Sequence, residues 1–336
     1  VSSLEKDFWS NQNVLITGLT GFIGCWLSEK LLENGAKVIG YNLSDTGALP
    51  LHPGLKEKIT LIKGDILDQK NLEDAFRKHG VSVCFHLAGQ SMVEVGDSSP
   101  LSTFEINARG TWVVLEAARN TGVERIVVSS SNAVYGDQKY FPTSEDAPLN
   151  GLHPYGASKV CTDVIARSYA KTCKMNVVAC RQTNTYGGGD FHLTHIVPHT
   201  ILAVLRGENP IIKSDGTPTK AYLYVEDTVS GYLRLAEEAH RPDVRGEAFN
   251  ITTESPTVLE LVSTIVEVSG NKNLKPEAKG TFETTRHDKE FLSMEKSKKV
   301  LGWEARFTLH DGLKKTFEWY KNNQALVEQY GHKTAY

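Results

Sequence analysis

The stretch Val14-Leu15-Ile16-Thr17-Gly18-Leu19-Thr20-Gly21-Phe22-Ile23-Gly24 decides the fold predicted for this chain. The apolar run 14–16 predicts a buried strand, and residues 25–34 continue with helical periodicity. Between them, Gly18 allows a tight turn, Gly21 lets the backbone approach a pyrophosphate, and Gly24 lets the helix pack closely on the strand. We expect this segment, with Thr20, Phe22 and Ile23, to bind a dinucleotide. The alternative is a glycine-rich turn that binds no ligand.

Length and composition exclude several classes of partner. The chain has 336 residues, 40% of them hydrophobic and 23% charged, which is ordinary for a globular protein with one large core or two smaller ones. The net charge of -3 gives no reason to expect nucleic acid or an anionic membrane as a partner. No apolar run approaches the length of a membrane span, and residues 1–9 lack a secretory signal. The odd number of cysteines and the lack of a CxxC pair favour reduced core thiols and a cytoplasmic protein.

Strand-like and helical patterns alternate through the first half of the chain. Such alternation predicts a parallel sheet with helices on both faces and with ligands at the carboxyl ends of the strands. Beyond the first strand, we expect strands at 37–42, 59–63, 81–87, 125–129 and 176–180, and helices at 69–78, 100–121 and 155–172.

After Arg181 the pattern loosens, and glycines and prolines separate shorter elements. We therefore expect an α/β protein with a Rossmann-type doubly wound parallel sheet over residues 1–185, which binds the dinucleotide. A smaller α+β lobe over residues 186–336 would hold the substrate. Residues 247–251 are expected to return to the first sheet as a further strand.

The ends of the second and third strands bear on the choice of cofactor. A dinucleotide-binding fold often places an acidic residue after the second strand, where it binds the adenosine ribose. Here Asn42 has that place and can still bond a hydroxyl, and Asp45 offers a carboxylate nearby. Because no arginine is positioned for a 2′-phosphate, NAD is favoured over NADP. Asp65 and Ile66 suit an adenine edge, although a plain turn aspartate would have the same sequence.

A third group of residues points to acid–base chemistry. Tyr155 and Lys159 lie four residues apart on one face of a predicted helix. A tyrosine with a pKa of about 10 is a poor base at neutral pH. A nearby ammonium group and the positive nicotinamide of an oxidised cofactor would lower that pKa. Ser131, after the strand 125–129, would donate a hydrogen bond to the substrate oxygen that Tyr155 deprotonates; a serine-rich turn is the alternative.

With these motifs in place, the chain resembles the extended short-chain dehydrogenase/reductases that modify nucleotide sugars, over nearly its whole length. Within that family it looks most like the CDP-glucose 4,6-dehydratases, because of residues 7–9, 26–28 and 181–190. The motifs that match the family are the glycine stretch 17–24, His86-Leu87-Ala88-Gly89, Asn107 with Gly110-Thr111, the pair Tyr155 and Lys159, and Leu301-Gly302-Trp303.

The resemblance implies a reaction and a set of ligands. Tyr155 would take the C4 hydroxyl proton of a nucleoside-diphosphate hexose while hydride passes from C4 to NAD; water would leave from C6, and the hydride would return there. Since the cofactor is regenerated, we expect NAD to stay tightly bound. The resemblance also implies a homodimer formed by the helices 100–121 and 155–172. It assigns Leu87, Ala88, Gly89, Asn107, Tyr155 and Lys159 to the cofactor and Gln90, Asn184, Asp190, His195, Lys220 and Arg286 to the substrate.

The chain departs from the dehydratase pattern at the residues that perform the elimination. Dehydratases of this type have an acid–base pair where this sequence has Asn132 and Ala133. Alanine has no proton to exchange, and an amide is no general acid. The stretch 129–136 looks more like that of the 4-epimerases, which need only Ser131, Tyr155, Lys159 and a sugar that can rotate. If elimination occurs, some other group must act as the base, and Tyr155 and His153 are candidates.

Several alternatives stay open at this point. A decarboxylase of nucleotide uronic acids is weakened by the absence of paired arginines in 181–190, and a non-catalytic NAD-binding protein is disfavoured by the intact Ser131, Tyr155 and Lys159. Lys220 and Arg286 would hold phosphate, or they are solvated surface cations. His192, His195 and His199 have helical spacing, but no carboxylate or thiolate completes a metal set, so no metal is expected.

Overall fold

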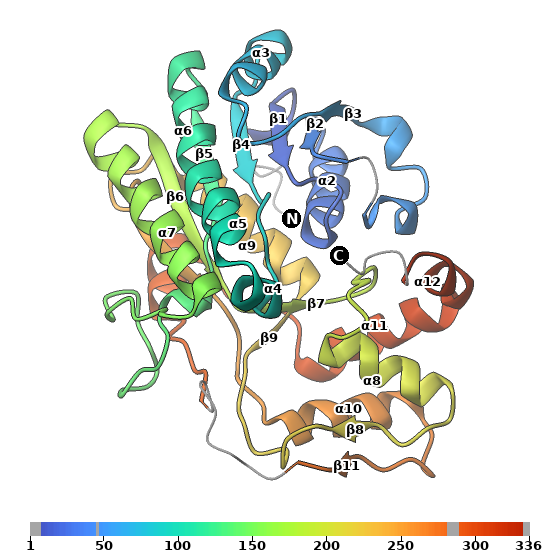
Figure 1. Cartoon of the computed structure of the whole chain (residues 1–336). Helices are drawn as coiled ribbons and strands as arrows, with labels where there is room; N and C mark the ends of the chain where they lie inside the picture. The colour runs from blue at the N-terminus through green and yellow to red at the C-terminus, as the bar shows by residue number, and fades with distance from the viewer. Residues whose placement is uncertain (1–7, 45–46, 281–288, 332–336) are drawn as a thin grey trace.

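Seven parallel strands form one sheet in the computed structural model, which describes residues 8–44, 47–280 and 289–331 (Figure 1). The strands are β1 (Asn13–Thr17), β2 (Lys37–Asn42), β3 (Thr60–Lys63), β4 (Val83–His86), β5 (Arg125–Ser129), β6 (Asn176–Gln182) and β10 (Ala248–Ile251). Their order in the sheet is β10-β6-β5-β4-β1-β2-β3, so the strand order reverses between β1 and β4. The predicted Rossmann-type doubly wound sheet is therefore confirmed, with its ligand crevice expected at this reversal.

Helices cover both faces of the sheet (Figure 1). Because side chains alternate across a strand, β1 sends Leu15 into the core beneath one layer and Val14 and Ile16 into the core beneath the other. The first layer contains α3 (Gln69–His79), α6 (Gly110–Thr121) and α7 (Pro154–Cys173), and the second contains α2 (Phe22–Glu33) and α9 (Val225–Glu238). Shorter helices α4 (Val93–Ser98) and α5 (Pro100–Phe104) precede α6.

The helix predicted over 100–121 is present with these bounds, but it is not α-helical throughout. Between α5 and α6, residues Glu105–Arg109 form a π-helical turn. A π turn admits one extra residue, and such turns often lie at functional sites. Here the turn contains Asn107, which is buried and directed at the loop after β4.

The second lobe packs around its own apolar core, which includes Ile201, Leu261 and Leu313. Its helices are α8 (Ile196–Leu205), α10 (Val258–Ser269), α11 (Leu309–Asn322) and α12 (Gln324–Tyr330), gathered at the lower right of Figure 1. Two small sheets pair β7 (Asn184–Tyr186) with β9 (Tyr222–Tyr224) and β8 (Ile211–Ile212) with β11 (Glu277–Ala278).

The chain returns from the second lobe to the large sheet. β10 pairs with β6, and α9 packs against β5 and β6. The division of the chain at residue 185 stays a prediction. Of the cysteines, Cys161 and Cys173 are exposed, whereas Cys25, Cys84 and Cys180 are buried. The expectation of core thiols therefore holds for three of the five.

Candidate active site

The glycine turn lies at the reversal point of the sheet, between the carboxyl ends of β1 and β4. Gly18 has a φ of 73°, and a Cβ there would lie 2.9 Å from the backbone of Ala88. A Cβ on Gly24 would lie 2.5 Å from the carbonyl oxygen of Leu19. Gly21 is the N-cap of α2, and no side chain among the described residues caps it. The first amides of α2, which include those of Phe22 and Ile23, are therefore available to a pyrophosphate.

Asn42 ends β2 beside the glycine turn and is buried. Its Oδ1 accepts a hydrogen bond of 3.1 Å from the backbone N–H of Thr20, so the side chain holds the turn in place. Its Nδ2 has no hydrogen-bond partner among the described residues. A buried donor without a partner is costly, and a ribose hydroxyl would satisfy it. The turn and this amide thus fit a dinucleotide. Asp45 lies outside the described residues.

Asp65 and Ile66 follow β3. The carboxylate of Asp65 accepts from the backbone N–H of Leu67 at 2.9 Å, and its carbonyl accepts from the hydroxyl of Tyr41 at 3.0 Å. Asp65 is exposed, whereas Ile66 is buried against Gly110. The Asp65 carboxylate therefore closes a turn, as in the alternative interpretation, and its contact with adenine stays a prediction.

The loop after β4 is fixed by Asn107. Its Oδ1 accepts from the backbone N–H of Gln90 at 2.8 Å, and its Nδ2 donates to the Gln90 carbonyl and to Ser158 Oγ, each at 2.9 Å. The side chain thus joins this loop to α7 and is already hydrogen-bonded within the protein. Gln90 retains a buried Oε1 with no partner in the described residues. Leu87, Ala88 and Gly89 form the same loop, and the N–H of Ala88 donates to Thr17 Oγ1.

Ser131, Tyr155 and Lys159 come together beyond the carboxyl ends of the strands, and the Ser131 hydroxyl lies near enough to Tyr155 to affect the pKa of the tyrosine. Lys159 is buried, and its Nζ donates to the carbonyl of Ser129 at 2.9 Å. Burial lowers the pKa of Lys159 to about 8. Burial also raises the pKa of Tyr155, and the nearby Ser131 hydroxyl only partly offsets this. The expected lowering of the Tyr155 pKa by Lys159 is therefore not met by the chain alone. The cofactor's positive charge would have to supply it.

Beside this group, Asn132 begins a short 3₁₀ turn that extends to Val134. Its Oδ1 accepts from Ser131 Oγ at 3.2 Å, and its side chain lies near enough to the carboxyl group of Glu290 to lower the pKa of that group. Glu290 also accepts from Asn184 Nδ2 at 3.4 Å. Lys220 lies near enough to lower the pKa of the Glu290 carboxyl. The predicted substrate residues Asn184 and Lys220 thus surround a carboxylate that the sequence analysis missed.

Little in the sequence points to Glu290. It follows four residues after Arg286, which is a predicted phosphate ligand and lies outside the described residues. Only the fold brings residue 290 to Asn132, across nearly half the protein's length.

Asp190 and His195 bind each other. Asp190 Oδ2 and His195 Nδ1 are 2.9 Å apart, and Asp190 Oδ1 accepts from the N–H of His192 at 3.1 Å. The carbonyl of Asp190 accepts from the hydroxyl of Tyr320. Although burial opposes it, the pair with Asp190 raises the pKa of His195. Asp190 is buried, and its carboxylate is already bonded within this loop. Of the two residues, therefore, only the half-exposed His195 can contact a ligand. No three potential metal ligands are clustered within the described ranges.

A buried ion pair supports the site from behind. Arg181 on β6 forms two hydrogen bonds with Asp163 on α7, of 2.8 and 2.9 Å, and both side chains are fully buried. Asp163 also accepts from Ser130 Oγ, and Arg181 donates to the hydroxyl of Tyr135. The pair thus fixes the segment on both sides of Ser131.

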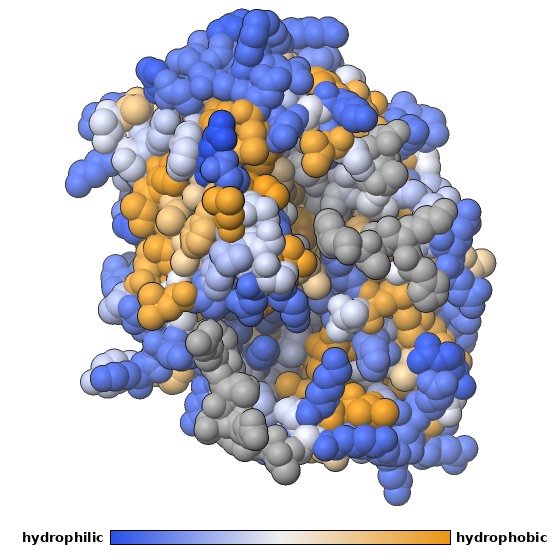
Figure 2. Space-filling view, viewed as in Figure 1, coloured by the Kyte–Doolittle hydropathy of each residue, from blue (hydrophilic) through white to orange (hydrophobic). Residues whose placement is uncertain are grey.

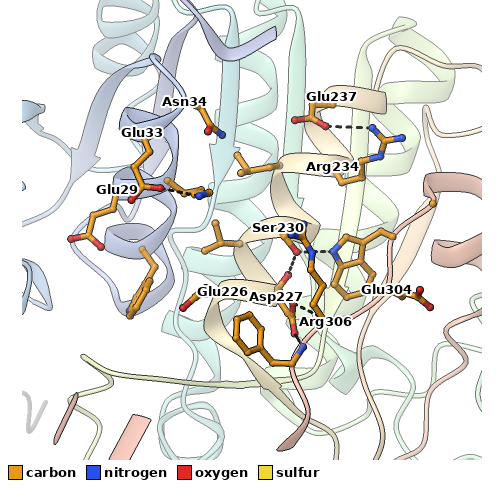
Figure 3. Close-up of a pocket in the computed structure, with 17 residues that line it drawn as sticks. Glu29, Glu33, Asn34, Glu226, Asp227, Ser230, Arg234, Glu237, Glu304 and Arg306 are labelled. Atoms are coloured by element: carbon orange, nitrogen blue, oxygen red, sulfur yellow. Dashed lines mark hydrogen bonds and ion pairs between the residues drawn. The ribbon is translucent and has the colours of Figure 1, made fainter. Parts of the chain in front are cut away.

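A cavity of about 850 Å³ lies elsewhere in the described structure (Figure 3). α2, α9 and residues 302–307 line it. Its polar groups bind one another: Asp227 accepts from the N–H groups of Arg306 and Phe307, and Trp303 Nε1 donates to Ser230 Oγ. None of Ser131, Tyr155 or Lys159 lines it, so this cavity is not the reaction site.

A doubly wound sheet with its glycine turn beside a Tyr-x-x-x-Lys helix makes the chain a short-chain dehydrogenase/reductase of the extended type. More particularly, it belongs to the family described as GDP-mannose 4,6 dehydratase, which matches residues 15–316. The predicted family resemblance is thus confirmed.

Similar proteins include both kinds of enzyme that the sequence suggested. The UDP-glucose 4-epimerase of Mycolicibacterium smegmatis is 32% identical over 92% of this chain and 98% of its own. The CDP-glucose 4,6-dehydratase of Salmonella typhimurium is 26% identical over 95% of this chain and 93% of its own. The dTDP-glucose 4,6-dehydratase of Streptomyces venezuelae, solved with NAD bound, superposes with a TM-score of 0.83 and 26% identity, covering 95% and 99% of the two chains.

The chain is therefore an NAD-dependent enzyme of the nucleotide-sugar epimerases and dehydratases. Across the described ranges, every helix is too short or too polar to cross a bilayer.

Proposed function

We propose that the chain is a 4,6-dehydratase of a nucleoside-diphosphate hexose, acting through transient oxidation at C4 with a tightly held NAD. Oxidation at C4 is supported by one observation: Ser131, Tyr155 and Lys159 lie together at the edge of the sheet that also contains the glycine turn. NAD, when bound, takes a hydride from the sugar and later returns it. The family description and the whole-chain likeness to a CDP-glucose 4,6-dehydratase support dehydration, with CDP-glucose as the first substrate to try.

Each residue of the trio has a separate task. Tyr155 takes the proton of the C4 hydroxyl, and Ser131 donates a hydrogen bond to the same oxygen. Lys159, which is held by its hydrogen bond to the carbonyl of Ser129, orients the nicotinamide ribose. The glycine turn and the start of α2 hold the pyrophosphate, and Asn42 Nδ2 meets the adenosine ribose. His195 and Lys220 are proposed to contact the nucleotide or sugar.

A 4-epimerase is the second candidate, favoured by one specific observation. Asn132 and Ala133 occupy the positions where dehydratases of this type have an acid and a base, and neither exchanges a proton. The identity to a UDP-glucose 4-epimerase points the same way.

Mass spectrometry separates the two reactions. The purified protein is incubated with CDP-, UDP-, GDP- and dTDP-hexoses without added NAD. Loss of one water from one of these substrates is the expected result. A product of unchanged mass with inverted C4 would make the enzyme an epimerase, and no turnover of any of them would contradict both candidates.

A homodimer is part of the proposal. Figure 2 shows apolar side chains gathered over the face formed by α5, α6 and α7. On these helices Leu101, Trp112 and Val164 are 76%, 44% and 51% exposed. A second copy of the chain that packs through the same helices would cover these side chains. Light scattering on a size-exclusion column is expected to give a dimer that Trp112→Glu dissociates, whereas Ile211→Glu, on an apolar residue away from this face, leaves it intact.

A further inference from the structure

A site built for elimination needs a proton acceptor near C5 and C6, and residues 132 and 133 supply none. The described structure does place one ionisable carboxyl group against Asn132, that of Glu290. Its backbone is held from two sides. The N–H of Glu290 donates to the carbonyl of Thr219 at 3.0 Å, and the carbonyl of Phe291 accepts from the N–H of Thr143 at 2.8 Å. Glu290 is thus fixed at the site by the fold.

The contacts of Glu290 form a continuous path to the oxidation site. The Ser131 hydroxyl lies close to Tyr155 and donates to Asn132 Oδ1 at 3.2 Å, and the Asn132 side chain lies beside Glu290. Asn184 binds the same carboxyl group from β7. The first two residues of this path face the C4 oxygen in the proposed reaction. C5 and C6 are the next two carbons of the hexose, and Glu290 is the next group along the path.

We propose that Glu290 is the acid–base residue of the elimination, replacing the pair that is missing at Asn132 and Ala133. This role rests on the proposed dehydration. In this role Asn132 positions the carboxyl group, and Asn184 donates a hydrogen bond to its Oε1. Because an amide does not titrate, neither asparagine takes up the proton, and Glu290 is the group that carries it.

The proton balance needs only this one carboxyl group. After oxidation at C4, the Glu290 carboxylate takes the C5 proton, and the C5–H electron pair becomes the C5–C6 double bond as the C6–O bond breaks. The proton on Glu290 leaves with the C6 hydroxyl as water. The double bond is reduced at C6 by the hydride removed from C4, and Glu290, reprotonated from solvent after the water has left, donates a proton to C5. That proton balances the one that Tyr155 took from the C4 hydroxyl.

The surroundings of Glu290 suit both directions of proton transfer. Burial raises the pKa of Glu290 to about 7, while Lys220 and the nearby amide of Asn132 act in the opposite direction. A group whose pKa lies near the working pH is an efficient acid and base. The other titratable neighbour is Tyr222, whose own pKa is raised chiefly by burial and then by Glu290.

The other candidates for the base are less suitable. His153 is the N-cap of α7, and its Nδ1 accepts from the N–H of Gly156 at 3.3 Å. Its ring stacks on that of Tyr155, with the centroids 6.1 Å apart. Tyr155 is already protonated once it has taken the C4 hydroxyl proton.

The test compares Glu290→Gln with Glu295→Gln, which makes the same change on an exposed carboxylate five residues away. We expect Glu290→Gln to lose elimination by about 10²–10⁴-fold while still oxidising C4, so that reduced nicotinamide accumulates on the protein. Exchange of the C5 proton with deuterated water is expected to fall in parallel. Glu295→Gln is expected to behave as wild type in all three measurements.

Each other outcome overturns the role of Glu290. If the wild type releases water and Glu290→Gln does so equally fast, Glu290 is not the acid–base residue, although the proposed function stands. If the wild type itself inverts C4 without losing water, the proposed function fails and this role fails with it. Should Glu290→Gln not fold, Glu290→Asp decides: elimination must slow more than C4 oxidation, and equal slowing contradicts the proposal.

Discussion

The side chain of Asn132 lies beside the carboxyl group of Glu290, near enough to lower its pKa, although 158 positions separate the two residues in the sequence. One lies directly after the serine that faces the reacting oxygen, and the other is fixed by strand-like contacts to Thr143 and Thr219. A neutral amide therefore stands where related dehydratases have an acid, and it is in contact with a carboxyl group from another part of the chain. This relationship makes the pH dependence of the enzyme informative.

The elimination half of the reaction is expected to depend on pH near 7. Because the Glu290 pKa is raised to about 7, the fraction of carboxylate falls to about a tenth at one pH unit below it. Proton removal from C5 needs the carboxylate, so C5 exchange should slow as the pH falls through 7. C4 oxidation uses Tyr155 and Lys159 and should lack this acid limb. Single-turnover measurements of C5 deuterium exchange and nicotinamide reduction across pH 5–9 compare the two steps. The same acid limb in both would contradict the assignment.

Lys220→Met should move that acid limb to higher pH. The ammonium group of Lys220 lowers the pKa of Glu290, so its removal lets the pKa rise further above the ordinary value of a glutamate. The pH profile of C5 exchange measures the shift. Lys289→Met, which removes an exposed ammonium group next to Glu290 in the sequence, serves as the control and should leave the profile in place. A shift to lower pH in Lys220→Met would contradict the electrostatic argument.

Gly18→Ala should yield a protein without NAD. Gly18 and Gly122 both have positive φ, of 73° and 75°, so alanine at either position carries backbone strain of roughly 1–2 kcal/mol. They differ in their neighbours: a Cβ on Gly18 would meet the Ala88 backbone at 2.9 Å, whereas Gly122 has nothing within 4 Å. The NAD released on denaturing each purified protein is the measurement. Gly122→Ala should keep its NAD, and equal amounts in the two variants would contradict the role of the glycine turn.

Much of the sheet could be predicted because its signal is local. The strands expected at 37–42 and 125–129 coincide with β2 and β5, since each is a short apolar run between turn residues. The helix predicted over 100–121 has these bounds, but the π turn at Glu105–Arg109, which accompanies the contacts of Asn107 with Gln90 and Ser158, was not predicted. Those contacts join segments that lie far apart in the sequence, so no local pattern contains them.

The candidate site divides in the same way. Gly18, Tyr155 and Lys159 belong to short motifs with fixed spacing, and the fold places them together. Glu290 has no such motif, because its position depends on backbone bonds to Thr143 and Thr219. The electrostatic effect of Lys159 on Tyr155 could not be predicted either, since it depends on the burial of both groups and on the bond from Lys159 to the carbonyl of Ser129.

Asp163→Ala should destabilise the fold strongly. Asp163 and Arg181 are both fully buried, and removal of the carboxylate leaves the Arg181 guanidinium charged and unpaired in the core. Breaking a buried pair in this way costs about 3–5 kcal/mol. Urea unfolding followed by circular dichroism measures the loss. Asp74→Ala, which breaks the exposed pair with Lys70 at 2.8 Å, is the matched control and should cost at most about 0.5 kcal/mol.

Because the pair of Asp163 and Arg181 also holds Ser130 and Tyr135, on both sides of Ser131, folded Asp163→Ala should show slower C4 oxidation as well. Equal stability of the two variants would mean that Arg181 finds another partner, and the support of Ser131 would then have to come from elsewhere.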